Sequence, residues 1–310
     1  LFALHPMHVE VVAWVVERKE LLAMSFGLMS WIAFQRWRQH GEVTIYLLCC
    51  LTFLASLGCK PMWVTWPLVL WLIDWSVNEF RWRSLVTSLF DKLPLFVMSA
   101  PVSLVTLYKT SLWALLAGDR PFFSGTDPSI LAGFRPFFSG TDPSILAAYG
   151  YYLEKSILPF GLSTFMELWL GSPVLPHTLV GALLLIVGTS IAVYQFRRHR
   201  LVLVGWLWFL ITLFPVAGLS PPGHAWVADR FSYLPHIGLF VGVTILLSAL
   251  VRIWPKLIRV GGVLVATLLA GLAFGASAQL QHWRDSEQYF ERAIDTGGGP
   301  VTHTYFANYL

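Results

Sequence analysis

Charged residues are scarce in this chain of 310 residues. Only 12% of the residues are Asp, Glu, Lys or Arg, whereas 56% are hydrophobic and the mean hydropathy is +0.65. A soluble domain carries about 25% charged residues, so this chain has too few charges to cover a surface that faces water. Lipid must therefore be the solvent for much of the chain. The 15 Trp residues fit this conclusion, because Trp favours the membrane interface.

The sequence also lacks the signatures of common soluble enzymes. It contains no Walker A motif, no G-x-G-x-x-G, no G-x-S-x-G and no C-x-x-C. The three cysteines, Cys49, Cys50 and Cys59, lie in or at the end of one apolar run without metal-ligand or disulfide spacing, so we interpret them as buried apolar residues. No signal peptide is recognisable at the start, and we expect the sequence to be a fragment that is truncated at both ends.

The basic residues give a net charge of +4 and a pI near 9.0. They form four short groups between apolar runs rather than one continuous stripe, which excludes nucleic acid as a partner. Lys and Arg concentrate in the cytoplasmic loops of membrane proteins, so we place all four groups on that side. The groups are Arg36 with Arg38, then Arg81, Arg83 and Lys92, then Arg197, Arg198 and Arg200, and finally Arg252, Lys256 and Arg259.

Apolar runs of the length of a membrane span recur along the chain. A spanning helix needs about 20 mostly apolar residues. The runs predict about eight spanning helices and an all-α, polytopic transmembrane helix bundle over residues 1–281. They are 20–36, 43–59, 61–78, 93–108, 179–196, 201–219, 237–253 and 260–280.

The remaining segments then face the extracytoplasmic side. They are 1–19, the turn at Lys60 and Pro61, the loop 109–178, the loop 218–236 and the tail after Gln281. The apolar stretch 145–165 is interrupted by Glu154 and Lys155. A crossing there would break the alternation of basic loops, so we expect this stretch to lie in the interface or to re-enter the membrane.

Two segments depart from the pattern of apolar runs. RPFFSGTDPSILA occurs at 120–132 and again at 135–147, which we interpret as a tandem duplication or an assembly error in a tolerant loop. The tail 282–310 contains the amphipathic stretch HWRDSEQYFERAID, then GGGP, then the start of a second helix at Val301. One helix and part of the next cannot bury a core.

Ionisable residues crowd the N-terminal segment. Such residues at membrane depth are costly and are functional candidates by default. From Pro6 onward the pattern suits a helix, in which Glu10 and Glu17 would share a face. Arg18 and Lys19 could bind an anionic head group, or the segment could neutralise itself with side chains that snorkel to the interface.

Three further polar features precede or punctuate the apolar runs. His5, His8 and Glu10 could be metal ligands, although H-x-x-H-x-E is a weak signature. Lys60, in a tight outer turn, could reach a lipid phosphate or simply snorkel. Asp74 lies near the cytoplasmic end of its helix, so we interpret it as paired or structural.

The loop 220–235 carries an acid, a base and aromatic residues directly before a spanning helix. Asp229 and Arg230 are adjacent, so their side chains should diverge toward separate partners. Arg230 could bind a phosphate while Tyr233 and its aromatic neighbours contact sugar or lipid. Alternatively, the loop is salt-bridged and locks the ends of helices.

Several motifs follow one another in a fixed order, namely HPMHVEVVAWVVERKELL, LGCKPMWVTWPLVLWLIDW, VGWLWFLITLFPVAGL, ADRFSYLPHIGLF and WRDSEQYFERAI. In this order they resemble the polytopic transmembrane and tetratricopeptide-repeat proteins of the protein O-mannosyltransferase type, including their bacterial relatives. The resemblance covers nearly the whole chain apart from 120–147. It implies a fold of the glycosyltransferase C superfamily (GT-C) over 1–281 and the start of an extracytoplasmic tetratricopeptide helical repeat over 282–310.

The resemblance implies a glycosyltransferase. Such enzymes move a sugar, here mannose or another hexose, from a polyprenyl or dolichyl phosphate to a protein hydroxyl or another acceptor. An acidic general base and cations that stabilise the departing phosphate are expected. Carried onto this sequence, the phosphate candidates are Arg18, Lys19, Lys60 and Arg230. The remaining polar lining is His5, His8, Glu10, Asp229 and Tyr233.

The chain departs from the family at its start. Family members begin with further spanning helices and an outer loop that holds the catalytic acid, so this acid is expected upstream of Leu1. Glu10 is not promoted to fill that role, and no metal ligand is assigned. The expected partners are membrane lipid, the lipid-linked sugar donor and a protein acceptor. The expected location is the bacterial inner membrane, with the site and the repeat on the periplasmic side.

Two other classes of function compete with this interpretation. A membrane scaffold would present tetratricopeptide repeats to partner proteins without chemistry, and outer-face substitutions would then change only stability. A transporter would show paired half-repeats with interrupted helices and an acidic residue at mid-membrane depth, and the sequence shows neither.

Overall fold

The computed structural model describes residues 1–77, 82–116, 145–162, 166–167, 174–219, 225–253, 258–296 and 300–310. Long helices dominate these residues, which confirms the all-α fold class that the sequence predicts. The first of them are α2 (Arg18–His40), α3 (Val43–Cys59), α4 (Trp66–Val77), α5 (Trp82–Phe90), α6 (Leu93–Leu116) and α7 (Ile145–Ile157). The others are α8 (Val174–Gln195), α9 (Arg200–Leu213), α10 (Tyr233–Ile253), α11 (Ile258–Gln281), α12 (Ser286–Asp295) and α13 (Pro300–Tyr309).

Short helical turns and one small sheet connect the long helices. The N-terminal segment consists of η1 (Phe2–Leu4), η2 (Pro6–His8), α1 (Val9–Ala13) and η3 (Val15–Glu17). Later turns are η4 (Pro61–Thr65), the π-helix η6 (Pro215–Leu219) and η7 (Asp229–Ser232). The strands β1 (Met166–Glu167) and β2 (Ala225–Val227) pair antiparallel and tie the segment after α7 to the segment before α10.

Within the described residues, three helices are long and apolar enough to cross a membrane, namely Thr178–Gln195, Asp229–Ile253 and Ile258–Gln281. Three apolar helices are shorter, namely Val43–Cys59, Leu93–Thr106 and Arg200–Leu213. These helices agree with an integral membrane protein. The described residues of the eight predicted runs are almost entirely helical, but α2 and α4 belong to neither set, so the number of crossings stays a prediction.

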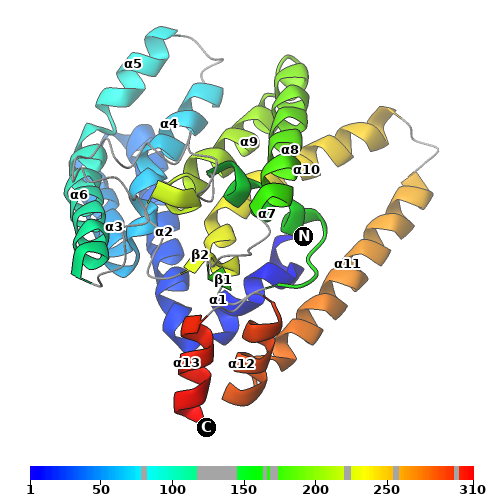
Figure 1. Ribbon diagram of the computed structural model, residues 1–310. Coiled ribbons are helices and arrows are strands. Elements are labelled where there is room, and N and C mark those ends of the chain that lie inside the picture. Colours follow the sequence, from blue (N-terminus) through cyan, green and yellow to red (C-terminus); the bar gives the residue numbers. More distant parts are fainter. Residues whose placement is uncertain are drawn as a thin grey trace.

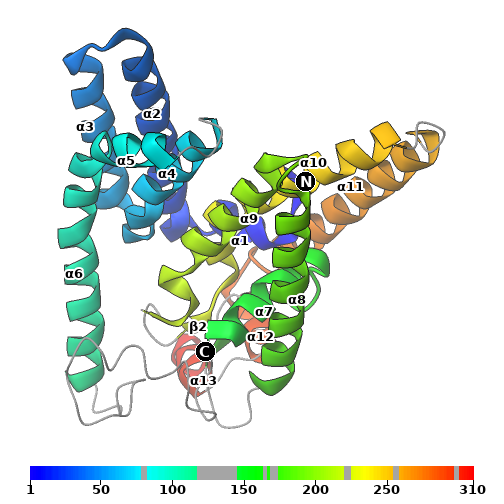
Figure 2. The ribbon, with the colours of Figure 1, turned by 90° about the horizontal axis from the view of Figure 1, so that it is seen from above.

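The helices form two groups that meet where α4 packs on α9 (Figure 1). In the first group α2 packs along α3, and α6 packs on α3 and η4. In the second group α7 packs on α8, and α9 lies between α8 and α10. Seen from above, the groups lie side by side with α1 between them (Figure 2). Helix α11 stands apart from α10 and contacts the N-terminal segment through η1, η2 and α1 (Figure 1).

A close approach of two backbones joins α9 to α10. A Cβ atom built on Gly205 would lie 2.3 Å from the carbonyl oxygen of Gly238. Backbone atoms cannot move aside as the tip of a flexible side chain can, so only glycine fits at this crossing. The indole nitrogen of Trp208 adds a hydrogen bond of 3.1 Å to the carbonyl of Leu234 across the same interface.

A polar network closes the predicted cytoplasmic end of the first group. The carboxylate of Asp74 accepts hydrogen bonds from Lys92 at 2.5 Å, Ser88 at 2.8 Å and Arg38 at 3.1 Å. Arg38 also binds the carboxylate of Asp91 at 3.1 Å. The structure thus confirms that Asp74 is paired, and it brings the ends of α2, α4, α5 and α6 together.

The segments predicted to share the extracytoplasmic side also meet in space. Glu10 of the N-terminal segment pairs with Arg230 of the loop 218–236. The ring of Trp14 packs on Trp283 of the tail with their centroids 5.9 Å apart. The grouping of these segments therefore matches the prediction, while their side of the membrane stays a prediction.

Two local predictions from the sequence are wrong. The pattern from Pro6 is not one helix, because the backbone is extended at Trp14 between α1 and η3. This stretch is rich in valine, whose branched side chain disfavours helix. Glu10 and Glu17 therefore share no helix face. The run 61–78 is likewise divided, since η4 precedes α4.

The region of the duplicated segment is described only in part. The copy at 120–132 and residues 135–144 of the second copy lie outside the described residues, as do Arg81 and Lys256. Helix α7 has 13 residues, or about 20 Å at 1.5 Å per residue, and a membrane core is about 30 Å thick. Helix α7 is thus shorter than a membrane core, and the interfacial or re-entrant placement of 145–165 stays a prediction.

The tail forms a pair of short helices that begins directly after α11. Asp285 caps α12 by accepting a hydrogen bond of 2.8 Å from the backbone nitrogen of Gln288. Phe290 stacks on Phe306 of α13 with centroids 5.6 Å apart. The predicted boundary at 281–282 thus coincides with the end of an element, and its assignment to a tetratricopeptide repeat stays a prediction.

Candidate functional site

A buried ion cluster joins the N-terminal segment, the turn before η4 and the segment before α10. It consists of Glu10, Glu17, Glu20, Lys60, Asp229 and Arg230, none of which is more than 9% exposed. Four carboxyl groups here accompany two cations. A buried charge is costly unless it is paired, so the partners of each group determine what the cluster can do.

Arg230 lies at the centre of the ion cluster. Its Nη1 lies 2.5 Å from Oε1 of Glu10, and its backbone nitrogen donates to Oε2 of the same carboxylate at 2.9 Å. Its Nε lies 3.5 Å from Oε1 of Glu17. The guanidinium carbon lies over the rings of Phe231 at 4.9 Å and Trp14 at 5.4 Å. These contacts leave the guanidinium bound on several sides.

Lys60 is the second buried cation of the ion cluster. Its Nζ donates to Oε2 of Glu17 at 3.1 Å and also pairs with Glu20. Burial by itself raises the pKa of Glu17, but the charges of Lys60 and Arg230 outweigh it and leave this pKa below its ordinary value. Burial raises the pKa of Glu10, and the charge of Arg230 only partly offsets that rise.

The side chain of Asp229 points to a different partner from that of Arg230, as their adjacency predicts. The hydroxyl of Tyr151 donates to Oδ1 of Asp229 at 2.7 Å. The hydroxyl of Tyr152 donates to the carbonyl of Ala228 at 3.1 Å and accepts from the nitrogen of Ala228 at 3.2 Å. Two consecutive tyrosines of α7 thus fix this loop.

The four predicted phosphate ligands differ sharply in their surroundings. Lys60 and Arg230 are buried and paired with glutamates, as described above. Lys19 lies at the rim, with Nζ 3.4 Å from Oε1 of Glu17 and 45% of its side chain exposed. Arg18 is exposed and forms no ion pair within the part of the chain that the structure describes. An anion approaching from outside therefore meets Arg18 and Lys19 first.

The other predicted lining residues belong to a second, neighbouring cluster. We define the histidine cluster as His5, His8 and His236. Nε2 of His8 lies 2.9 Å from Nδ1 of His236, and the rings of His5 and His236 lie 5.2 Å apart. The ring of Tyr233 packs edge-on against His8 at 4.9 Å.

Four residues that complete these clusters were not predicted from the sequence. They are Tyr151, Tyr152, Ser156 and His236. His236 carried a usable signal, because an ionisable residue beside an apolar run is a functional candidate by default. No such signal marked the three residues of α7, because their partners Asp229, Ala228 and His236 lie about 80 positions away in the sequence.

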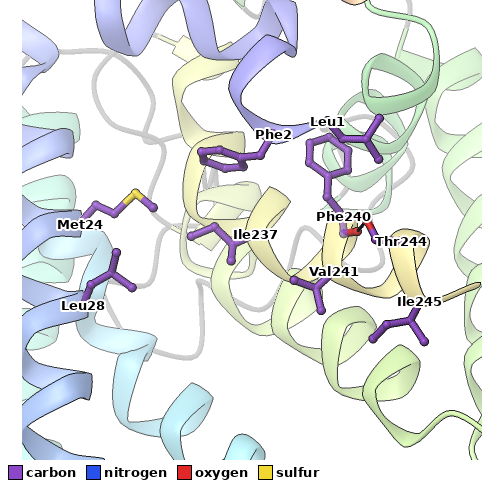
Figure 3. Close-up of a pocket in the computed structure, with 9 residues that line it drawn as sticks. All are labelled: Leu1, Phe2, Met24, Leu28, Ile237, Phe240, Val241, Thr244 and Ile245. Atoms are coloured by element: carbon purple, nitrogen blue, oxygen red, sulfur yellow. Dashed lines mark hydrogen bonds between the residues drawn. The ribbon is translucent and has the colours of Figure 1, made fainter. Parts of the chain in front are cut away.

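An apolar groove opens beside the histidine cluster, between α2 and α10 (Figure 3). Its volume is about 490 Å³, which is enough for part of a lipid chain. It is lined by Leu1, Phe2, Met24, Leu28, Ile237, Phe240, Val241, Thr244 and Ile245. The hydroxyl of Thr244 donates to the carbonyl of Phe240 at 2.7 Å, so even this polar side chain offers the groove no unpaired donor.

The groove and the two clusters share walls. Phe2 lines the groove and packs on His8 with centroids 4.3 Å apart, and Phe240 lines it and packs on His236 at 4.8 Å. From Arg18 to Met24 the helix α2 rises about 9 Å at 1.5 Å per residue. The ion cluster thus lies at the N-terminal ends of α2 and α10, and the groove lies deeper between the same two helices.

Residues of the types that bind metals are present, but they already form hydrogen bonds and ion pairs with other groups of the protein. Among the described residues, no group of three His, Cys, Asp or Glu side chains is placed to hold a metal ion. Glu10 binds Arg230, and His8 binds His236 and the carbonyl of Phe2.

Comparison with known proteins adds no assignment. No protein-family model, no curated protein and no solved structure matches the chain.

Proposed function

We propose that the chain is the core of a membrane glycosyltransferase that moves a sugar from a polyprenyl phosphate to a hydroxyl acceptor outside the cytoplasm. The apolar groove is the main observation that supports this proposal. It lies beside residues 237–245 of a helix that is long and apolar enough to cross a membrane, and it leads toward a charged end. A polyprenyl phosphate has the same two parts, an apolar chain and an anionic head.

The surroundings of the four predicted phosphate ligands favour different roles for them. The glutamates around Lys60 and Arg230 already satisfy these cations, and a phosphate would have to displace a buried carboxylate to reach them. Arg18 and Lys19 stand at the exposed start of α2, where the helix dipole also favours an anion. We therefore assign the head group to Arg18 and Lys19, and the support of the loop before α10 to Lys60 and Arg230.

The superfamily and the tail belong to the same proposal. The GT-C assignment rests on the order of motifs in the sequence and is supported by the helical fold with apolar helices. The assignment of the tail to a tetratricopeptide repeat is supported by the contact between α12 and α13.

A binding measurement tests the assignment of the head group. The dissociation constant for a short-chain polyprenyl phosphate is measured on the whole chain in lipid nanodiscs. A charge-assisted hydrogen bond contributes about 1.5–3 kcal/mol, so Arg18→Gln with Lys19→Gln should weaken binding by about tenfold or more. Thr244→Trp, which fills the groove, should weaken binding of the apolar chain independently.

Arg36→Gln is the matched control for this experiment. Arg36 is an exposed arginine of the same helix at the opposite end, so its substitution should leave the affinity unchanged. Equal affinity in all four proteins would remove the donor site from the groove. Transfer of the sugar from the polyprenyl phosphate to a hydroxyl acceptor then tests the reaction itself.

A non-catalytic scaffold is the second candidate, and the internal pairing of the ion cluster favours it. Buried glutamates that satisfy Lys60 and Arg230 suit a loop that locks helix ends, as in the alternative interpretation of the sequence. A scaffold predicts no saturable binding of polyprenyl phosphate and no effect of Arg18 or Lys19 beyond thermal stability. The same nanodisc experiment therefore separates the two candidates.

A further inference from the structure

Three imidazoles pack against one another beneath the groove. His5, His8 and His236 are at most 4% exposed. Their ring centroids are 5.1 Å apart for His8 and His236, 5.2 Å for His5 and His236, and 5.7 Å for His5 and His8. They come from two distant parts of the chain, so the cluster fastens the N-terminal segment to α10.

The hydrogen bonds determine which nitrogen of each ring carries a proton. Nδ1 of His8 lies 2.8 Å from the carbonyl of Phe2, which only accepts, so this nitrogen must donate. Nε2 of a neutral His8 then accepts from Nδ1 of His236 at 2.9 Å. The hydroxyl of Ser156, which donates to the carbonyl of Tyr152 at 2.5 Å, has its oxygen 2.8 Å from Nε2 of His236.

Both ring nitrogens of His5 also form hydrogen bonds. Its Nε2 donates to the carbonyl of Ser156 at 3.2 Å, and its Nδ1 accepts from the nitrogen of Met7 at 3.4 Å. Neutral imidazoles at His5 and His8 thus satisfy both ring nitrogens of each residue. A proton added to Nδ1 of His5 would point at the backbone N–H of Met7. A proton added to Nε2 of His8 would point at the Nδ1–H of His236.

Only one added proton has a place to go. Because the hydroxyl of Ser156 donates to the carbonyl of Tyr152, 2.5 Å away, Nε2 of His236 can carry this proton and donate to Oγ of Ser156. A second proton would put two positive rings about 5 Å apart in a buried site, where both desolvation and repulsion oppose it. The arrangement therefore suits neutral rings and resists full protonation.

A nucleophilic role for Ser156 uses the same ring nitrogens but fits the site poorly. A hydroxyl, a base and a third group that orients the base form the signature of an activated nucleophile. Ser156, however, is the penultimate residue of α7. The C-terminal end of a helix disfavours negative charge on an alkoxide or an oxyanion. We assign no nucleophile here.

We propose that the histidine cluster is an acid-released clasp on the wall of the groove. With neutral rings it holds η1 and η2 against α7 and α10, and it keeps Phe2 in place through the hydrogen bond and ring contact with His8. With protonated rings the N-terminal segment detaches and the groove loses the wall formed by Leu1 and Phe2. The clasp depends on the groove, whatever ligand the groove binds.

The charged groups around the histidine cluster do not reverse its preference for neutral rings. On its own segment lies Glu10, which is bound to Arg230 of η7. From α10 the only titratable neighbour is the phenol of Tyr233. From α7 come Glu154 and Lys155, whose side chains pair with each other at 3.6 Å. From α11, residues 260–281 carry no charge.

The direction of the pH effect follows from the burial of the rings. Burial lowers the pKa of His5 from 6.5 to about 4 and that of His8 from 6.5 to about 3. A detached histidine titrates near 6.5, so attachment is fully present above that pH and is lost as the pH falls below it. At pH 5 each of these histidines should favour detachment by about thirtyfold.

Hydrogen exchange on the whole chain in nanodiscs tests the clasp. Protection of the peptide 1–13 is compared at pH 7.5 and pH 5.0, with exchange times corrected for the intrinsic pH dependence of amide exchange. The clasp predicts a loss of protection of thirtyfold or more in 1–13 and no loss in α9. Unchanged protection would overturn the proposal, and so would an equal loss in α9, which signals global unfolding.

Matched substitutions connect the effect to the imidazoles. His8→Asn and His5→Gln keep the donors to the carbonyls of Phe2 and Ser156 but cannot take up a proton, so each should reduce the pH effect by about thirtyfold. His40→Gln alters an exposed histidine at the end of α2 and should keep the full effect. A pH effect of the same size in all three variants would contradict the clasp. If the variants fail to fold, the comparison of 1–13 with α9 in the unaltered chain still decides.

Discussion

Single side chains hold the polar interior of this protein together, and Asp74 is the clearest case. Its carboxylate is the counterion of Lys92, which is completely buried. Removing one partner of a buried ion pair leaves an uncompensated charge and costs about 3–5 kcal/mol. Asp74→Ala should therefore lower the midpoint of thermal unfolding markedly. Asp295→Ala, at an exposed position of α12, should leave the midpoint nearly unchanged. Equal midpoints for both variants would contradict the pairing of Asp74.

Glu17 gives a prediction about pH at the same scale. Because Lys60 and Arg230 hold its pKa below the ordinary 4.5, Glu17 should stabilise the fold above pH 4.5 and lose this effect as the pH falls further. Glu17→Gln should cost about 2 kcal/mol at pH 7. The difference from the unaltered chain should shrink toward pH 3, as measured by thermal unfolding in detergent. A difference that stays constant over this range would show that Glu17 acts by packing rather than by charge.

At the scale of elements, the crossing of α9 and α10 depends on glycine. Gly205→Ala would drive a Cβ atom into the backbone of Gly238, and overpacking of this kind costs about 1–3 kcal/mol. Gly271→Ala is the matched control, because a Cβ atom at that position of α11 meets nothing within 4 Å. The control should be neutral or slightly stabilising, since Ala favours helix over Gly. Both variants are compared by thermal unfolding, and equal stability would contradict the crossing.

The elements also show what the sequence could and could not predict. The run 43–59 matches α3 residue for residue, because length and apolar composition alone define such a helix. Helix α5 was missed, since its Arg83 was interpreted as part of a cytoplasmic connection. The break at Trp14 was missed as well, because the periodic pattern continues across it.

The types of residue that form the candidate site could be predicted from the sequence, but their interaction partners could not. Polar residues at membrane depth marked the N-terminal segment, Lys60 and the loop before α10, and these segments do meet. The sequence could not show that Glu10 and Glu17 would occupy Arg230, because that pairing depends on how segments about 220 residues apart pack. Nor could it reveal the groove, which is formed by ordinary apolar residues of three segments.

For the whole molecule, we propose that the apolar groove holds the lipid donor of a transferase. The two helix groups, with α1 between them, leave the groove open between α2 and α10 (Figures 2 and 3). The charged ends of the same helices provide exposed cations at Arg18 and Lys19. Binding of a polyprenyl phosphate in this groove is the central claim.

Photo-crosslinking tests that claim most directly. A polyprenyl phosphate with a diazirine in its isoprenoid chain is incorporated with the whole chain into nanodiscs, irradiated, and located by mass spectrometry of peptides. We expect labels on α2 near Met24 and Leu28 and on α10 between 237 and 245, and we expect unlabelled polyprenyl phosphate to compete for them. Labels spread over the lipid-facing surface of α11, without competition, would contradict the account.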